Sequence, residues 1–397
     1  TLLERLLTHL QPLRGPARHD LVLVLGHHAH DIQAHVARLP DGLAPLIDHV
    51  LGLGMQFGLW VEPEMVNPDS DLARAHPEWI MQPGHGRLPI EARHQQVLNL
   101  AIPGAYRHVL EQLSAVFTDN HIDYIKWDHN RDLIDAGTQP SGRPGVHAQT
   151  LATYRLMDDL KAAHPGLEIE SCSSGGSRVD LGILERTDRV WVSDCIDPHD
   201  RQQMMRWTQQ LLPPELLGSH IASGISHTTG RSHELNFRAA TAIFGHLGIE
   251  WDIRRASEAD MAELAEWVAF YKANRSLLLA GDLYRVDFPD ASLNAFGVVA
   301  PDKSRALYSL ASVDRSEVAL LGRLRLPGLD ASRRYRVAPV LVGRAPSGLR
   351  PPAWWGVERD WSNELEDLTA HKPPRFVPSR PDLGVVLPGS ALASNGL

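Results

Sequence analysis

The stretch "DYIKWDHNRD", Asp123 to Asp132, decides the fold. Its first half is rich in apolar and aromatic residues, which predicts a buried strand, and its second half is crowded with polar side chains. Lys126 and Asp128 lie two residues apart, so on a strand both side chains point to the same side. A charged pair that ends an apolar strand favours a site at the carboxyl edge of a parallel sheet.

The same pattern recurs along the chain. Seven apolar segments predict strands: Asp20–Leu25, Gln56–Glu62, Asp123–Asp128, Leu167–Ser171, Val190–Asp194, Leu216–Ile221 and Leu247–Asp252. Helix-like segments lie between them: Leu43–Leu53, Ala105–Phe117, Val146–Ala163, Arg201–Leu212, Glu234–Gly245 and Glu258–Leu278. This alternation predicts an α/β fold with a parallel sheet and outer helices. Seven strands are one short of a (β/α)₈ TIM-type barrel, so we expect such a barrel with one strand missing.

The pattern changes after about Gly281. Short apolar segments, separated by Pro, Gly, Asp and Ser, replace the alternation and predict a C-terminal antiparallel β-sandwich. We therefore expect two domains, a catalytic barrel over residues 1–280 and a sandwich over residues 281–397.

Composition narrows the function classes. The 397 residues carry 39 Lys+Arg against 48 Asp+Glu, a net charge of -9 without a basic stripe, which speaks against nucleic-acid binding. The sequence contains no apolar run long enough for a membrane span and no signal peptide at Thr1. Two cysteines make no disulfide framework, so we expect a reducing, cytoplasmic location.

Two aspartates end apolar strands on separate strand–helix units, Asp128 and Asp194. Two carboxylates facing each other over one barrel mouth are the minimum equipment for glycoside hydrolysis. Asp is also a favoured helix N-cap, so each could instead cap the helix that follows. The spacing alone leaves both interpretations open.

Other polar stretches were weighed in the same way. Lysine in a barrel mouth needs a carboxylate or a polar ligand, so we expect Lys126 to lower the pKa of Asp128 and hold a hydroxyl. The turn "ESCSSGGSRVD" (Glu170–Asp180) lets backbone approach a ligand but lacks the ending of a P-loop. Cys172 shows no activating histidine, which disfavours a thiol nucleophile. "GHHAHDIQAH" (Gly26–His35) lacks a familiar metal-binding spacing, so we expect a solvated loop, no metal and no cofactor.

Six motifs, kept in order, resemble those of the α-galactosidases of glycoside hydrolase family 36. The resemblance runs from about Leu39 to the C-terminus. The matching stretches are "FGLWVEPEMVNPDSDLARAHPEW" (Phe57–Trp79), "RHQQVLNL" (Arg93–Leu100), "YIKWDHNR" (Tyr124–Arg131), "ESCSSGGSRVDLGIL" (Glu170–Leu184), "VWVSDCIDPHDR" (Val190–Arg201) and "GHLGIEWDI" (Gly245–Ile253).

The resemblance implies roles for individual residues. It implies that Asp128 is the nucleophile and Asp194 the general acid/base in a retaining, exo-acting hydrolysis of terminal α-galactosides, such as melibiose and raffinose-type oligosaccharides. A retaining mechanism predicts carboxyl groups about 5–5.5 Å apart. Arg93 and Lys126 would keep Asp128 ionised, while Asp194 would need a raised pKa to carry a proton. A homo-oligomer is also expected. The galactose subsite is implied to contain Trp60, Arg93, Lys126, Asn130, Cys172 and Gly175.

The resemblance is lost toward the N-terminus. Family members carry an N-terminal β-sandwich, a first barrel strand and an aspartate pair after the second strand, and nothing in this sequence corresponds to them. The place of the pair reads "VLVLGHHAHDIQAHVARLPDGL" (Val22–Leu43), where Asp31 is the only acidic residue before Pro40. We interpret this as a truncated or frame-shifted reading frame, or as divergence. Two lost carboxylates would remove charge-assisted hydrogen bonds worth about 1.5–3 kcal/mol each, so we expect impaired activity.

Other activities compete with this interpretation. Within the same superfamily, the site could serve galactosyl transfer or α-N-acetylgalactosaminide hydrolysis, although the small Cys172 and its "SSGG" turn fit a free 2-hydroxyl better than an acetamido group. An inactive galactose-binding remnant is a different class. Retention of both Asp128 and Asp194 argues against it. A metal hydrolase built on the histidines is a further alternative.

Overall fold

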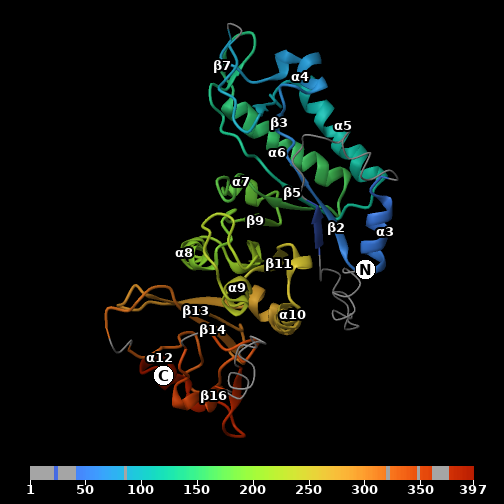
Figure 1. Cartoon of the computed structure of the whole chain (residues 1–397). Coiled ribbons are helices and arrows are strands. Elements are labelled where there is room, and N and C mark those ends of the chain that lie inside the picture. Colours follow the sequence, from blue (N-terminus) through green and yellow to red (C-terminus); the bar gives the residue numbers. More distant parts are fainter. Residues whose placement is uncertain (1–21, 26–41, 85–86, 319–321, 347–348, 360–374) are drawn as a thin grey trace. The chain divides into compact units, whose positions relative to one another are not determined.

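The computed structural model describes residues 22–25, 42–84, 87–318, 322–346, 349–359 and 375–397 (Figure 1). The chain divides into two compact units, of which the first ends at Asp194 and the second begins at Cys195. Each unit is described by itself. The predicted domain boundary near Gly281 stays a prediction.

Parallel strands form the sheet of the first unit. Its order is β1-β2-β5-β8-β9, and neighbouring strands all run parallel. The register places Trp60 beside Lys126, and Lys126 beside Glu170. The carboxyl ends of these strands therefore meet at one edge of the sheet. The strands are β1 (Val22–Leu25), β2 (Gln56–Val61), β5 (Tyr124–Trp127), β8 (Glu168–Ser171) and β9 (Arg189–Trp191).

Helices connect these strands. They are α3 (Ala44–Gly52), α4 (Asp71–Ala75), α5 (Pro103–Asp119), α6 (Val146–Ala163) and α7 (Leu181–Leu184). α5 begins at Pro103, where the missing N–H removes no helical hydrogen bond and the fixed φ suits the first turn. Two short antiparallel strand pairs lie in the connecting segments: β3 (Met65–Val66) with β4 (Gln96–Val97), and β6 (Gly137–Thr138) with β7 (Arg143–Pro144).

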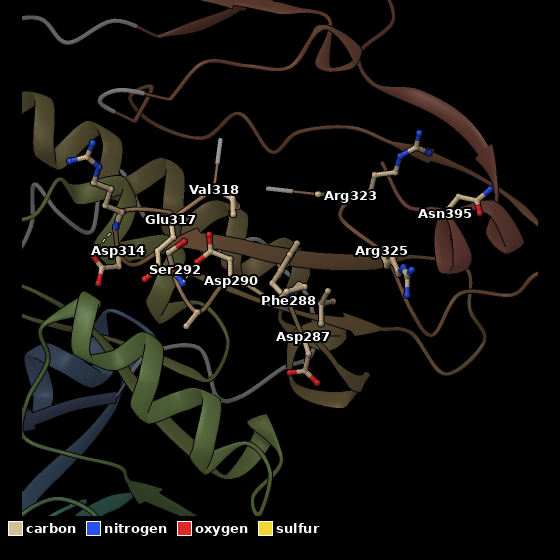
Figure 2. A pocket seen from close by; sticks show the side chains of 15 residues that line it. Asp287, Phe288, Asp290, Ser292, Asp314, Glu317, Val318, Arg323, Arg325 and Asn395 are labelled. Atoms are coloured by element: carbon tan, nitrogen blue, oxygen red, sulfur yellow. Dashed lines mark hydrogen bonds between the residues drawn. The ribbon is translucent and has the colours of Figure 1, made fainter. Parts of the chain in front are cut away.

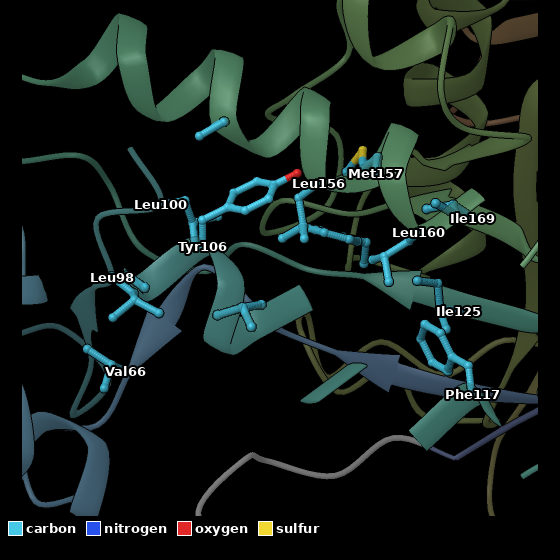
Figure 3. Packing of buried hydrophobic residues seen from close by; sticks show 14 of the residues in the cluster. Val66, Leu98, Leu100, Tyr106, Phe117, Ile125, Leu156, Met157, Leu160 and Ile169 are labelled. Atoms are coloured by element: carbon cyan, nitrogen blue, oxygen red, sulfur yellow. The ribbon is translucent and has the colours of Figure 1, made fainter. Parts of the chain in front are cut away.

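The core of the first unit lies between the sheet and helices α5 and α6. Ile125 from β5 and Ile169 from β8 pack with Phe117 of α5 and Leu160 of α6 (Figure 3). Full burial of each such aliphatic side chain contributes about 1.5–3 kcal/mol. This apolar layer fixes β5 and β8, and with them the start of the loops that carry the polar residues.

The second unit begins with a parallel strand pair and three helices. The strands are β10 (Leu217–Ala222) and β11 (His246–Glu250), and the helices are α8 (Pro198–Thr208), α9 (Leu235–Ala242) and α10 (Glu258–Ala280). A capping box of Ser257 and Asp260 starts α10, because each side chain bonds the other residue's backbone N–H. Phe244 and Phe296 meet edge to face in the apolar cluster that joins these helices to the strands that follow.

Antiparallel strands follow α10. β12 (Asp282–Val286), β13 (Leu293–Val299) and β14 (Ala306–Ser312) form one sheet, while β15 (Arg334–Val337) pairs β18 (Val385–Pro388) and β16 (Val357–Arg359) pairs β17 (Phe376–Pro378). The predicted antiparallel pairing after Gly281 is confirmed, whereas a sandwich of two packed sheets stays a prediction. The remaining helical segments are α12 (Gly389–Ser394), η1 (Pro77–Trp79), η2 (Pro214–Leu216), η3 (Ile253–Arg255) and η4 (Ala353–Trp355).

Every strand and helix predicted before Gly281 has a counterpart, with one instructive error. The strand predicted over Val190–Asp194 ends already at Trp191. Beyond it, Val192 lies against Gly176 and Ser193 against Gly175, two glycines of the turn after β8. Asp194 is therefore on a loop and not on the strand itself. The histidine-rich segment 26–41, including Asp31, lies outside the described residues.

Candidate active site

Asp128 follows β5 directly and is only 6% exposed. Trp60 Nε1 and Asn130 Nδ2 donate to its Oδ2 at 3.0 and 2.6 Å, and the backbone N–H of His129 donates to its Oδ1 at 2.8 Å. The thiol of Cys172 also donates to this carboxylate. Because the next helix, α6, begins only after Gly145, Asp128 does not cap it.

These donors decide the charge of Asp128. Burial alone would raise the pKa of the Asp128 carboxyl, but hydrogen bonds from Asn130, Cys172, Trp60 and the His129 amide together lower the pKa below its ordinary value. Asp128 is therefore ionised at neutral pH. We expected Lys126 and Arg93 to favour the ionised form, and their contribution stays a prediction, whereas the causes that lower the pKa of Asp128 here are hydrogen bonds.

Lys126 lies two residues before Asp128, the nucleophile candidate, and has two partners. Its Nζ is 3.6 Å from Glu170 Oε1 and 4.3 Å from the centre of the Trp191 ring. A lysine in such a half-buried position is stabilised by the carboxylate and by the negative face of the ring. The lysine was expected to need a carboxylate, and Glu170 on the neighbouring strand provides it.

The thiol of Cys172 is a donor rather than a nucleophile. Burial, together with the charge of Asp128, raises the pKa of the Cys172 thiol well above its ordinary value, although Lys126 acts in the opposite direction. A protonated thiol cannot attack carbon but can donate a hydrogen bond.

The turn after β8 connects the two aspartates. Ser174 Oγ donates to Asn130 Oδ1 at 3.1 Å, and Ser173 Oγ donates to the carbonyl of His129 at 3.0 Å. Gly175 has φ +84°, and a Cβ there would lie 2.7 Å from Ser193 Cα. Only glycine fits this position, because a side chain would collide with the backbone that leads into Asp194.

Asp194 has different surroundings. It is exposed, and Trp191 Nε1 donates to its Oδ1 at 3.0 Å. It does not cap the helix that follows, since the N-cap of α8 is Asp197, whose side chain accepts from the N–H of His199. The raised pKa expected for Asp194 and the expected separation of the two carboxyl groups stay predictions.

Arg93 is not brought to this cluster. It is exposed, in a turn closed by the Ala92–Gln95 bridge, with φ +54°. It makes no hydrogen bond or ion pair with another residue in the described ranges. Its predicted role in the galactose subsite stays a prediction.

Sequence reasoning missed a buried carboxylate beside the nucleophile candidate, Glu64. It accepts from Trp127 Nε1 at 3.0 Å, Arg178 Nη1 at 2.8 Å and Thr153 Oγ1 at 2.8 Å, and His129 Nε2 lies 3.9 Å away. Burial would raise the pKa of Glu64, but the charges of Arg178 and His129 and these hydrogen bonds lower it to about 2. Glu64 thus holds the residues on either side of Asp128. Its position just past the end of an apolar strand was the available signal.

Asp197 anchors a second network, within the second unit. It is fully buried and accepts from Thr229 Oγ1, while Arg231 Nε and His233 Nε2 each lie 3.1 Å from its oxygens. Burial would raise the pKa of Asp197, but these donors and neighbouring charges lower it. The network joins the start of α8 to residues 229–233.

The two units each contain a cavity. One, of about 280 Å³ in the first unit, is lined in part by Glu64, His129 and Ser174. The other, of about 940 Å³ in the second unit, lies between Phe288 and Asp290 on one side and Arg325 on the other (Figure 2). No predicted site residue lines this second cavity.

Among the described residues no three His, Cys, Asp or Glu side chains are grouped so as to hold a metal ion. None of the described helices has the length and apolar character that a membrane span requires.

Comparisons with known proteins identify the class. The melibiase family model matches residues 24–281. An α-galactosidase of Escherichia coli is 42% identical over 335 residues, which cover 82% of this chain and 47% of that protein. The structure of the family 36 α-galactosidase AgaB from Geobacillus stearothermophilus gives a TM-score of 0.78 at 31% identity, covering 95% of this chain and 48% of that one. An AgaA variant from the same organism, solved with raffinose, gives a TM-score of 0.75 at 31% identity, covering 93% and 50%.

In sequence and fold the chain therefore resembles glycoside hydrolases of the α-galactosidase type, and the resemblance to family 36 is confirmed. The chain belongs to the melibiase family. It spans less than half the length of the curated α-galactosidases that it matches. The α/β class is confirmed by these structural neighbours and by the parallel sheet of the first unit.

Proposed function

We propose that the protein hydrolyses terminal α-galactosides with retention of configuration, with Asp128 as nucleophile and Asp194 as general acid/base. The observation that carries this proposal is the state of Asp128. It is a buried carboxylate with four donors and a lowered pKa at the end of a barrel-type strand, where no helix needs it as a cap. A nucleophile that must remain ionised needs such surroundings.

The reaction would proceed in two displacements. An oxygen of Asp128 attacks C1 of galactose while the bond from C1 to the leaving oxygen breaks, and Asp194 gives its proton to that oxygen. Asp194 then takes a proton from water, which attacks C1 and releases α-galactose from Asp128. Both carboxyl groups return to their starting states.

The neighbours of Asp128 support a galactose subsite. Trp60, Asn130 and Cys172 contact the nucleophile directly, and Lys126 lies on the same face of its strand. Donors of this kind can bind sugar hydroxyls as well as the carboxylate. The raffinose bound to the related AgaA variant supports a raffinose-type oligosaccharide as the substrate.

Covalent trapping tests the proposal. A 5-fluoro-α-galactosyl fluoride forms the glycosyl-enzyme faster than water releases it, so the purified chain should gain the mass of one fluorogalactosyl group. Peptide mapping should place that group on Asp128. A label on another residue would reject Asp128 as nucleophile, and absence of both label and turnover would reject the hydrolase function of this chain.

A further inference from the structure

Trp191 contacts Asp194 and also Lys126, which lies two residues before Asp128. It is the last residue of β9 and only 1% exposed. Its indole Nε1 donates to Asp194 Oδ1 at 3.0 Å, and its ring face lies 4.3 Å from Lys126 Nζ. One rigid side chain thus touches the acid/base candidate and a residue on the strand that leads into Asp128.

The indole N–H defines the orientation of Asp194. Asp194 lies three residues beyond the end of β9, on a loop, and is exposed. An exposed carboxylate on a loop samples several rotamers unless a partner holds it. Because the indole is buried, its bond to Oδ1 favours one orientation of the carboxylate and leaves Oδ2 without a hydrogen bond within the described residues.

The other face of Trp191 ties this orientation to the nucleophile strand. Lys126 is held over the ring while it also pairs with Glu170 Oε1 at 3.6 Å. Gly175 supports the same arrangement from outside, because its turn lies against the backbone of Ser193. The contacts of Trp191 therefore fix the carboxylate of Asp194 relative to β5.

We propose that Trp191 is a positioning residue that aims the proton of Asp194 at the leaving oxygen of the substrate. This inference rests on the proposed function. Proton donation matters most when the leaving group is strongly basic and little when it is a stable anion, so loss of aim should depend on the leaving group. A merely structural residue would affect all leaving groups alike.

The test is Trp191→Phe, which keeps an aromatic ring and removes the N–H. We expect kcat/KM for melibiose or raffinose to fall by about tenfold or more, while kcat/KM for 2,4-dinitrophenyl α-galactoside changes by less than about threefold. The ratio of the two values on one preparation is the readout, because any misfolded fraction cancels from it.

Trp127→Phe is the matched control. Trp127 is equally buried and also donates its indole N–H to a carboxylate at 3.0 Å, but that carboxylate is Glu64. This variant should lower both rates by the same factor and leave the ratio unchanged. An unchanged ratio in Trp191→Phe would overturn the inference.

Asp194→Ala separates this inference from the proposed function. If Asp194 is the acid/base, the variant keeps activity on the dinitrophenyl substrate, and azide accelerates it by attacking the glycosyl-enzyme without base assistance. If Asp194→Ala shows neither effect, the proposed role of Asp194 fails. If it shows both and Trp191→Phe keeps the wild-type ratio, only the positioning role fails.

Discussion

The surroundings of the two aspartates differ in every respect that sets the behaviour of a carboxylate. Asp128 is buried, receives hydrogen bonds from three side chains and one amide, and has a lowered pKa. Asp194 is exposed, and in the described part of the chain its carboxylate receives one hydrogen bond, from Trp191. The first arrangement stabilises the ionised form of Asp128, whereas Oδ2 of Asp194 accepts no hydrogen bond within the described residues.

Under the proposed mechanism, this difference gives the two carboxylates separate tasks. A nucleophile must stay ionised and fixed, while an acid/base must carry a proton in one step and give up its charge in the next. Donors collected around Asp128 achieve the first. The loop position and single donor of Asp194 are suited to the second.

Removing the charge of the buried aspartate should have the largest effect. Asp128→Asn keeps the shape but not the negative oxygen, so we expect turnover of every α-galactoside to fall by about 10³-fold or more. Steady-state rates on an aryl α-galactoside and on raffinose measure it. Retained wild-type turnover would show that the two aspartates do not differ as described.

Glu64→Gln should have the next largest effect, on stability. It removes the negative partner of Arg178 inside the unit, and breaking one side of a buried ion pair costs about 3–5 kcal/mol. Urea unfolding measures the loss. Glu78→Gln is the control, because Glu78 pairs with His76 at the surface and should change stability by less than about 1 kcal/mol.

The comparison of the wild type with Glu64→Gln also gives a pH prediction. The pKa of Glu64 falls from its ordinary value of 4.5 to about 2, so its stabilisation is complete above pH 4.5 and is lost as the pH falls toward 2. The difference in unfolding free energy between wild type and Glu64→Gln should therefore shrink over this interval, by about 3 kcal/mol. A difference that stays constant from pH 5 to pH 2 would contradict the lowered pKa.

The strands were predictable because parallel strands buried on both faces appear in the sequence as apolar runs, and Asp128 was placed correctly because it ends such a run. The hydrogen bonds were not predictable from local patterns. Those that Glu64 accepts join residues 63, 89 and 114 positions apart, a separation at which no sequence periodicity acts. The true end of β9 was not predicted either, and the glycine turn that contacts the residues beyond it, Val192 and Ser193, comes from another part of the chain.

Gly175→Ala should have a smaller effect, and it tests the contact between the two regions. A Cβ at this φ of +84° meets Ser193 Cα at 2.7 Å, so the turn or the loop before Asp194 must move. We expect about 1–3 kcal/mol of lost stability and lower activity on raffinose. Urea unfolding and steady-state rates measure the two.

Gly54→Ala is the matched control for backbone strain. Gly54 has φ +74°, but nothing lies within 4 Å of a Cβ placed there. Gly54→Ala should therefore lose only the stability that the strained backbone costs, about 1 kcal/mol, and its activity should not change. Equal losses in the two variants would show that the contact with Ser193 does not matter.

The smallest expected effect is a shift in the pH profile. Trp60→Phe removes one donor from the ionised form of Asp128, so the pKa of Asp128 should rise toward its ordinary value. Because the proposed mechanism needs this carboxylate ionised, the acid limb of kcat/KM should move to higher pH by up to about one unit. Trp207→Phe, at an exposed tryptophan, should leave the limb in place. An acid limb that Trp60→Phe does not move would mean that the remaining donors hold the charge of Asp128 without it, and that the two aspartates differ through fewer contacts than the structure suggests.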